Sequence, residues 1–469
     1  MKRTRQSACR RAAAAALCLA LASCALKAPP ERNELAKQAL GDAQPPAQWR
    51  GGASTGGVST GGAVSDGWLK TLNDPRLDAL VDETLARNVD LRIAATRVEQ
   101  AESSLKIAGS ALYPAVNLLA REGGKLGGDG SGFTGIGINA AWELDLWGRV
   151  RYGQRAASGD LGSTQADFAY ARQSLAALVA RSWFVAAESA LQGQVARDML
   201  AAAERLADLT RVRLRVGNAN EQDVALADAN VQNYRESLRQ LELAREQALR
   251  ALEVLAGRYP AATLAAAVAL PALPAAVPSG IPSELLERRP DVVAAERRVA
   301  AAFDRTEEAR AARLPRINLT AGISSIFSSL FVLQDRDNPS ASAGVGLFAP
   351  LFTGFALQGQ VELREAEQKR AVAEYAATGL KAFNEVESAL ANEAALGDRY
   401  AALSRLVAEN ERALKYSEIQ YRIGKADQSA VINAQLRLYG SRAQLVRMQA
   451  ERLAQRVALH LALGGNFAI

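Results

Sequence analysis

The sequence predicts an α+β membrane protein, in which a few β-strands are joined to very long α-helices and one chain supplies only part of a barrel. Three observations predict this fold. The 469-residue chain contains an internal repeat, and each copy has a long proline-free tract of helix-forming residues. Each copy also has two short segments in which apolar and polar residues alternate.

The chain begins with the features of a bacterial lipoprotein. Five basic residues precede an apolar run over residues 12–22, and the run ends in the sequence LASC at 21–24. A bilayer span needs about 20 apolar residues, so residues 1–23 are predicted to be a secretory signal peptide. The LASC ending resembles a lipobox, which makes Cys24 the predicted lipid attachment site. Ala25 follows in place of an aspartate, and this resemblance implies sorting to the outer membrane.

Residues 24–67 have a different composition from the rest of the chain. Proline pairs stand at 29–30 and 45–46, and residues 51–62 consist of glycine pairs and small residues. This composition predicts a lipidated flexible tether in front of the first repeat.

The charge balance and the residue inventory argue against nucleic-acid binding and enzyme chemistry. Removal of the signal peptide takes away five of the 56 basic residues and none of the 50 acidic ones, so the mature chain is nearly neutral. Cys24 is the only cysteine that remains, and no disulfide is expected within a chain. The single histidine, His460, lies in an alanine- and leucine-rich stretch and is predicted to be structural. We therefore expect no catalytic residues, cofactor or metal site.

Two copies of one unit follow the tether. Residues 85–91 align with 286–292 at an offset of 201, and the sequence RVG at 215–217 aligns with RIG at 422–424 at an offset of 207. Each copy is expected to hold a helix, two strands and a long helical hairpin. The predicted parts are a first repeat at 68–270, a proline-rich linker at 271–282 and a second repeat at 283–469.

The hairpins follow from the placement of proline and glycine. No proline occurs in residues 115–259 or 351–469. A helix over residues 153–216 would be about 95 Å long at 1.5 Å per residue. The first hairpin is predicted to turn at Gly217-Asn218, with a new helix from Glu221 or Asp223 towards Ala256, and the second is predicted to turn at Gly424-Lys425.

Four segments are predicted as membrane strands, at 115–121, 133–142, 316–323 and 342–351. In the second of them, Ile136, Ile138 and Trp142 share one face, while glycine and asparagine share the other. Apolar residues outside and small or polar residues inside are typical of outer-membrane strands. The pattern alone leaves a soluble four-stranded sheet open. Because four strands cannot close a barrel and lipid does not tolerate an open edge, several copies are expected to share one barrel.

Two further patterns are predicted to have no function of their own. The sequence GSGFTG at 130–135 matches G-x-G-x-x-G, but it leads into an alternating strand and not into a helix that could hold a phosphate. Glu307 and Glu308 are expected to be solvated on a helix face.

The chain resembles the TolC-like outer-membrane factors, and within them the lipoprotein branch of NodT and OprM type. The resemblance covers residues 68–465. It implies a homotrimer with a shared 12-stranded barrel that continues into a long periplasmic α-helical barrel. The most specific stretches are 68–77 with the sequence NDP, WELDLWGR at 142–149, ERRPD with the AE that follows at 287–296, APLFTG at 349–354 and YRIG at 421–424.

This resemblance implies a passive exit duct of a tripartite efflux system in the outer membrane of a Gram-negative bacterium. The implied partners are a periplasmic adaptor (membrane fusion) protein, an inner-membrane pump and outer-membrane lipid, with no nucleic acid. Two alternatives remain: a non-conducting, lipid-anchored periplasmic coiled coil, and the outer-membrane component of a type I protein secretion system. The alternating strands and alanine-rich helices argue against the coiled coil.

The resemblance also implies a periplasmic gate at the hairpin turns, formed by Asp223, Tyr421, Asp427 and Asn433. Ala430 and Asn433 stand where relatives place aspartates, so an acidic ring would depend on Asp223 and Asp427. The alternative interpretation is that both aspartates only begin helices, where a carboxylate contributes about 0.3–1 kcal/mol.

Overall fold

The computed structural model describes residues 26–43, 45–46, 48–51, 66–124, 132–265, 268–278, 282–328 and 340–467. The chain forms two compact units: unit 1 contains residues 1–44, 96–166 and 293–378, and unit 2 contains the remainder. The predicted signal peptide, Cys24 and the first two residues of the G-x-G-x-x-G match lie outside the described residues.

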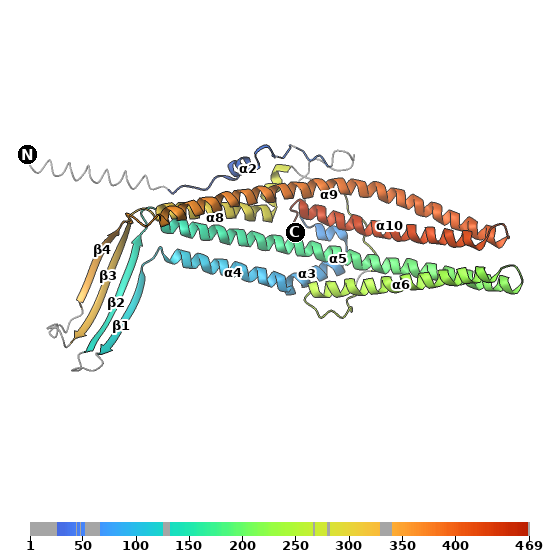
Figure 1. The fold of residues 1–469 in the computed structure, drawn as a ribbon, viewed down its shortest axis with the longest axis horizontal. Helices are drawn as coiled ribbons and strands as arrows, with labels where there is room; N and C mark the ends of the chain where they lie inside the picture. Colours follow the sequence, from blue (N-terminus) through green and yellow to red (C-terminus); the bar gives the residue numbers. More distant parts are fainter. Residues whose placement is uncertain are drawn as a thin grey trace, which may run out of the picture. The chain divides into compact units, whose positions relative to one another are not determined.

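Unit 1 contains one antiparallel sheet in the order β1-β2-β3-β4 (Figure 1). The prediction of four strands is therefore confirmed. The last strand ends at Phe348 and not at Leu351, because Pro350 has no N–H to donate to a ladder. The strands are β1 (Ala115–Gly124), β2 (Gly132–Leu144), β3 (Arg316–Ser328) and β4 (Ser340–Phe348).

The register of the sheet gathers the predicted apolar residues on one face. Ile138 pairs with Leu118 on one side and with Ile323 on the other, and all three are more than half exposed. On the opposite face, Asn139 pairs with Asn117. Since residues paired across strands point to the same side, one face of the sheet is apolar and uncovered, and the other is mainly polar or small.

Helices α4 (Val89–Ser110), α5 (Arg149–Arg215), α8 (Pro290–Ala311) and α9 (Ala356–Arg422) contribute their strand-proximal parts to unit 1. Helix α5 begins four residues before the predicted start. The reason is a cap that the periodicity did not reveal: the Asp145 carboxylate accepts the N–H groups of Val150 and Arg151, both at 3.0 Å.

Two expectations for unit 1 are wrong. Glu307 is not solvated: its side chain is only 7% exposed and pairs with Arg310 and Lys27. Glu308 is half-buried, and this burial raises the pKa of its carboxyl. The helix face that bears both residues packs inside the unit, and nearby basic side chains compensate the buried charge.

The prediction of a flexible tether is corrected for its described part. Residues 32–40 form helix α2, and Leu35 on this helix is buried in unit 1. In unit 2, Trp49 is also buried. The overall composition of residues 24–67 does not predict this packing. A few apolar side chains between the prolines are enough to bind the segment to neighbouring helices.

Unit 2 consists of two helical hairpins with short helices around them. The distal part of α5 pairs with α6 (Glu221–Leu255), and that of α9 pairs with α10 (Gln428–Ala462). The lengths match between the halves, with 67 residues in α5 and in α9 and 35 in α6 and in α10. The predicted turns are confirmed, since Gly217 and Gly424 have φ values of +79° and +76°.

The core of unit 2 surrounds Trp183, whose indole N–H donates to the Asp74 carboxylate at 2.8 Å. Asp74 is also the N-cap of α3 (Pro75–Arg87) and accepts main-chain N–H groups of that helix. His460 is buried in this unit and stacks on Trp68, with 5.9 Å between the ring centroids. This packing accords with the structural role predicted for the histidine.

Candidate functional site

Both hairpin turns lie at the same end of unit 2 (Figure 1). In the first turn, the Asn218 N–H donates to the Arg213 carbonyl at 2.8 Å, which closes the end of α5. A capping box then starts α6: the Asn220 side chain accepts the Asp223 N–H at 2.9 Å, and the Asp223 carboxylate accepts the Asn220 N–H at 3.0 Å.

The second turn has the same backbone but only half of this cap. The Lys425 N–H donates to the Gln420 carbonyl at 2.8 Å, and the Asp427 carboxylate accepts the Ala430 N–H at 2.9 Å. Ala430 occupies the position of Asp223 and has no side-chain acceptor to return a bond. The departure from the family pattern at Ala430 therefore has a structural consequence at the start of α10.

The four predicted gate residues occupy different environments. Asp223 is partly buried, Asp427 and Asn433 are exposed, and Tyr421 is buried with 5% of its surface accessible. Both aspartates cap helices, as the alternative interpretation expects. The Asp427 side chain is exposed and the Asp223 side chain is only partly buried, so both carboxylate charges remain accessible to an ion, and capping and gating are compatible roles.

Gln428, which the sequence analysis did not identify, joins the two hairpins. Its side-chain carbonyl accepts from the Thr210 hydroxyl at 2.8 Å, and its amide donates to the Asp223 carbonyl at 3.1 Å. The Tyr421 hydroxyl lies 3.5 Å from the same Gln428 oxygen, at the limit of a hydrogen bond. Gln428 is only 3% exposed, so these bonds form away from bulk water.

Arg213 completes the connection from the first hairpin. Its guanidinium lies 4.3 Å from the centroid of the Tyr421 ring, and its Nη1 donates to the Tyr421 carbonyl at 3.0 Å. Leu206 and Val431 pack on Tyr421 from both hairpins. We call Thr210, Arg213, Tyr421, Gln428 and the Asp223 carbonyl the hairpin lock.

The two repeats differ at residues of the hairpin lock. At the offset of 207, the counterparts of Tyr421 and Gln428 are Leu214 and Glu221. Glu221 is exposed. At these two positions the second hairpin therefore has side chains that contact the first, and the first hairpin has no equivalent of them.

A protein-family model described as outer membrane efflux protein matches the chain at residues 80–258 and 281–465. The interval between the two matches contains most of the predicted linker, and each match includes one of the helical hairpins.

Individual proteins match over most of their length. The pyoverdine export outer membrane protein OpmQ of Pseudomonas aeruginosa is 30% identical over 96% of this chain and 95% of its own. The probable efflux pump outer membrane protein TtgC of Pseudomonas putida is 31% identical over 86% of each chain. The cation efflux system protein CusC of Escherichia coli (strain CFT073) is 30% identical over 86% of this chain and 88% of its own.

Solved structures share the fold. The outer-membrane channel OprN superposes with a TM-score of 0.84 at 25% identity and covers 94% of this chain and 100% of its own. The open state of the Neisseria gonorrhoeae outer membrane channel MtrE gives a TM-score of 0.79 at 26% identity, with 94% and 98% coverage.

Proposed function

The chain belongs to the outer membrane efflux protein family and is an outer-membrane efflux channel, and from this premise we propose that it works as the trimeric exit duct of a tripartite system. Three copies of four strands would give a barrel of twelve. The long helices of the three copies would line the periplasmic part of the duct. Substrate and energy would come from an inner-membrane pump through a periplasmic adaptor, and the duct itself would catalyse no reaction.

The observation that supports the shared barrel most strongly is the sheet of unit 1. In the described strands, β1 and β4 each pair on one side only, so both outer edges are open. The apolar face suits lipid and the opposite face suits a water-filled lumen. An open edge in lipid leaves main-chain groups unpaired, and pairing β4 of one copy with β1 of the next removes both edges.

Disulfide cross-linking across the two edges tests this arrangement. The acylated Cys24 would be the only native cysteine of the mature chain, so the background is low. A cysteine at Val116 in β1 combined with one at Ala343 or Val345 in β4, all on the apolar face, should give covalent trimers after oxidation. Chains with only one of these cysteines are the matched control. Monomers from every combination would contradict the shared barrel.

We propose that the hairpin lock holds the resting channel narrow at the periplasmic turns. Asp223 and Asp427 would add charge there, with Asn433 nearby. In a trimer each carboxylate appears three times, and a narrow pore with low-dielectric walls strengthens its field. Cations would therefore pass more readily than anions. The support is the set of contacts that joins two hairpins through Gln428 and Tyr421.

Cys24 is proposed as the acylated residue. Cys24→Ser should abolish fatty-acid labelling and leave the signal peptide uncleaved by lipoprotein peptidase. Labelling that persists in Cys24→Ser would contradict the lipobox assignment. Transport is expected to survive in part, because the barrel itself anchors the channel in the membrane.

A further inference from the structure

The described N-terminal segment of unit 1 is held by the first turns of α5. The Lys27 N–H donates to the Tyr152 hydroxyl at 2.8 Å, and the Lys27 carbonyl accepts from Arg155 Nη1 at 3.2 Å. Tyr152 is buried, with 5% of its surface accessible. Because both main-chain groups of Lys27 are bonded to α5 side chains, the backbone is fixed at this residue.

Leu26, the preceding residue, is held by close packing. Leu26 packs against Gly148, just before α5, and a Cβ at Gly148 would collide with the Leu26 side chain. The repeat counterpart Gly354 also has a positive φ, but a Cβ there would meet open space. Gly354 lies 206 residues after Gly148, and at this offset Gln358 replaces Tyr152 and Val361 replaces Arg155. Only the first repeat therefore has the residues that hold the N-terminal segment.

Charges reinforce this contact. Arg155 also pairs with Asp304 at 3.1 Å, and the Asp304 side chain is 5% exposed. The Lys27 ammonium lies 3.4 Å from the Glu307 carboxylate, which is also buried. The partners of Lys27 are thus fixed by other parts of unit 1 and do not depend on the segment that they hold.

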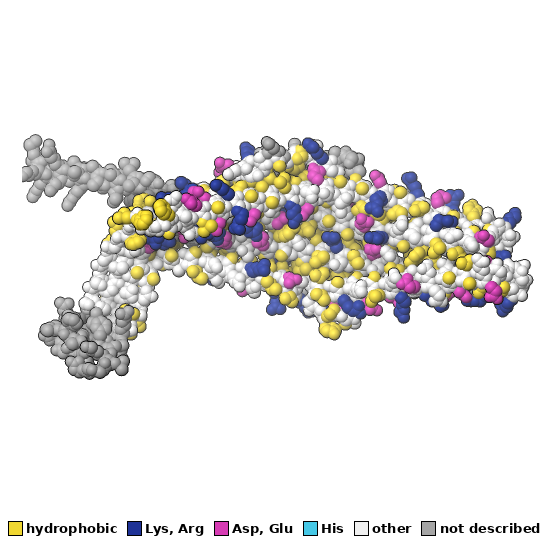
Figure 2. Space-filling view, viewed as in Figure 1, with side chains coloured by type: hydrophobic (Ala, Val, Ile, Leu, Met, Phe, Trp, Pro, Cys, Tyr) yellow, Lys and Arg dark blue, Asp and Glu magenta, His cyan; other side chains and the backbone are white. Residues whose placement is uncertain are grey.

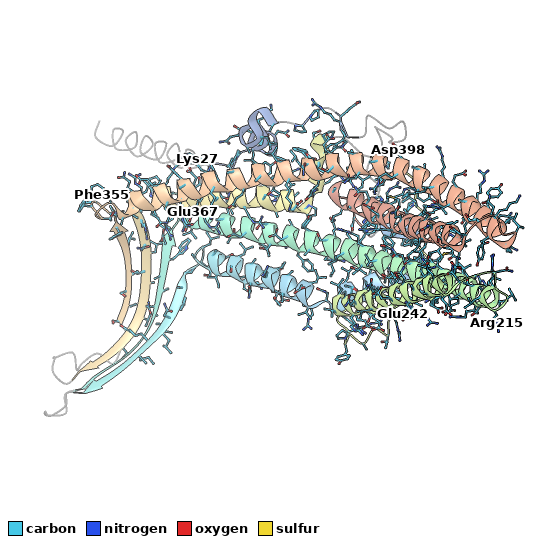
Figure 3. All side chains as sticks on the ribbon, turned by 45° about the vertical axis from the view of Figure 1, so that its right-hand side comes forward. Lys27, Arg215, Glu242, Phe355, Glu367 and Asp398 are labelled. Carbon is cyan, nitrogen blue, oxygen red and sulfur yellow. The ribbon has the colours of Figure 1, made fainter. Side chains whose placement is uncertain are left out.

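An exposed apolar patch lies at the strand–helix junction of the same unit. Leu351, Phe352 and Phe355, between β4 and the first turn of α9, are 96%, 81% and 73% exposed. Figure 2 shows hydrophobic side chains gathered at this junction, and Figure 3 labels Phe355 and Lys27 towards the strand end of the helices of unit 1. Trp147 at the same junction donates its indole N–H to the Pro315 carbonyl at 2.7 Å. Aromatic residues at strand ends suit the membrane–water interface.

We propose that Leu26 and Lys27, with Gly148, Tyr152 and Arg155, form a latch that holds the lipid-bearing end of the chain at this junction. Cys24 is two residues before Leu26, so their Cα atoms are at most about 7 Å apart in an extended chain. The acyl chains therefore enter the bilayer close to the strand–helix junction of unit 1. This inference rests on the proposed acylation of Cys24.

Proteolysis of the purified, acylated full-length channel in detergent tests the latch. A protease must bind an extended stretch of main chain, so cleavage after Lys27 requires release of the segment. With an endoprotease that cuts after lysine, Tyr152→Phe should accelerate cleavage at Lys27–Ala28 roughly two- to ten-fold, the range expected for one lost hydrogen bond. Intact-mass spectrometry identifies the product that begins at Ala28.

The matched control is Tyr375→Phe. Tyr375 is buried in unit 1, and its hydroxyl has no hydrogen-bond partner among the described residues, so this variant should be cut at the wild-type rate. Equal rates in Tyr152→Phe and wild type would overturn the latch, as would an equal acceleration after Lys37 in α2. The mass of undigested protein reports the acyl chains separately. An unmodified Cys24 would contradict the proposed lipid anchor, while the cleavage rates would still report on the contact.

Discussion

A buried histidine makes the stability of unit 2 sensitive to acid. His460 is buried against Trp68, and this burial, together with the charge of Arg456, lowers its pKa to about 4. A histidine in the unfolded chain has a pKa of about 6.5. The neutral form is therefore favoured in the folded state, and its contribution is complete above pH 6.5 and lost as the pH falls towards 4. The full difference corresponds to about 3 kcal/mol.

We predict that His460 stays neutral in the folded channel down to about pH 5. Because it is the only histidine, a histidine-labelled sample gives one imidazole signal in an NMR titration. The expected midpoint lies near pH 4. A midpoint near 6.5 would show that the ring is hydrated and would contradict its burial against Trp68.

Loss of Gln428 is predicted to open the resting channel. Gln428→Ala removes the acceptor of one Thr210 hydrogen bond and the donor to the Asp223 carbonyl, so two hydrogen bonds between the hairpins are lost, each contributing about 0.5–1.5 kcal/mol. Single-channel resting conductance should rise, and cells should become sensitive to large antibiotics. The control is Glu221→Ala, the exposed counterpart in the first repeat, which should leave conductance unchanged. Unchanged conductance in Gln428→Ala would place the constriction elsewhere.

Tyr421→Phe is the conservative test of the same contacts. It removes the hydroxyl near Gln428 and keeps the ring under Arg213. Since the hydroxyl contact is long, at 3.5 Å, we expect a smaller rise in conductance than for Gln428→Ala. A larger rise in Tyr421→Phe would show that the hydroxyl, and not the amide, holds the hairpins together.

Substitutions of Asp223 separate charge from capping. Asp223→Asn keeps an oxygen that can accept the Asn220 N–H but loses the charge, whereas Asp223→Ala loses both. If the carboxylate contributes to a cation-selective gate, reversal potentials in asymmetric salt should show weaker cation preference in both variants. A cation preference that both variants retain would reduce Asp223 to a helix cap.

At the scale of single residues, the sequence predicts side chains that interact within one turn. It does not predict side chains whose partners are far away in the sequence. Gly217, Gly424 and the acidic residue after each turn were predicted, since capping depends on residues a few positions apart. Gln428 was not, because its hydrogen-bond partner Thr210 lies 218 residues away. Glu307 was misjudged for the same reason, as its burial depends on the packing of unit 1.

At the scale of elements, the periodicity of apolar residues predicted the four strands, and the placement of proline and glycine predicted both hairpins. The errors concern the ends of helices and strands, where a single nearby group determines the first or last residue. Asp145 starts α5 before the predicted residue, and Pro350 excludes the last predicted residues from β4. Helix α2 was missed because the glycine and proline content of its surroundings concealed a short stretch with Leu35 and Leu40 buried.

The faces of β2 give an element-scale prediction. Ile138→Lys places a charge on the apolar face, which costs about 2–4 kcal/mol near the bilayer midplane. Asn139→Lys, one residue along, places the same charge on the opposite face and should cost little. Heat-induced dissociation of the oligomer on gels should therefore be shifted to lower temperature by Ile138→Lys only. Equal shifts would argue for a soluble sheet with no lipid-facing side.

At the scale of the whole molecule, the prediction of a shared barrel rests on there being only four strands in one chain. The structure supports this premise, because the described strands form one open sheet of four. The number of copies does not follow from the strands, because eight strands from two copies would also close a barrel. The trimer comes from the resemblance to the family.

Planar-bilayer recording of the purified protein tests the central claim most directly, since a duct must conduct ions and a periplasmic scaffold cannot. We predict discrete, long-lived conductance steps with cation preference, and larger steps in Gln428→Ala than in Glu221→Ala. The same preparation should migrate as a trimer on cross-linking. A trimeric, correctly folded preparation that never conducts, in wild type or in Gln428→Ala, would contradict the account and favour a non-conducting structural role.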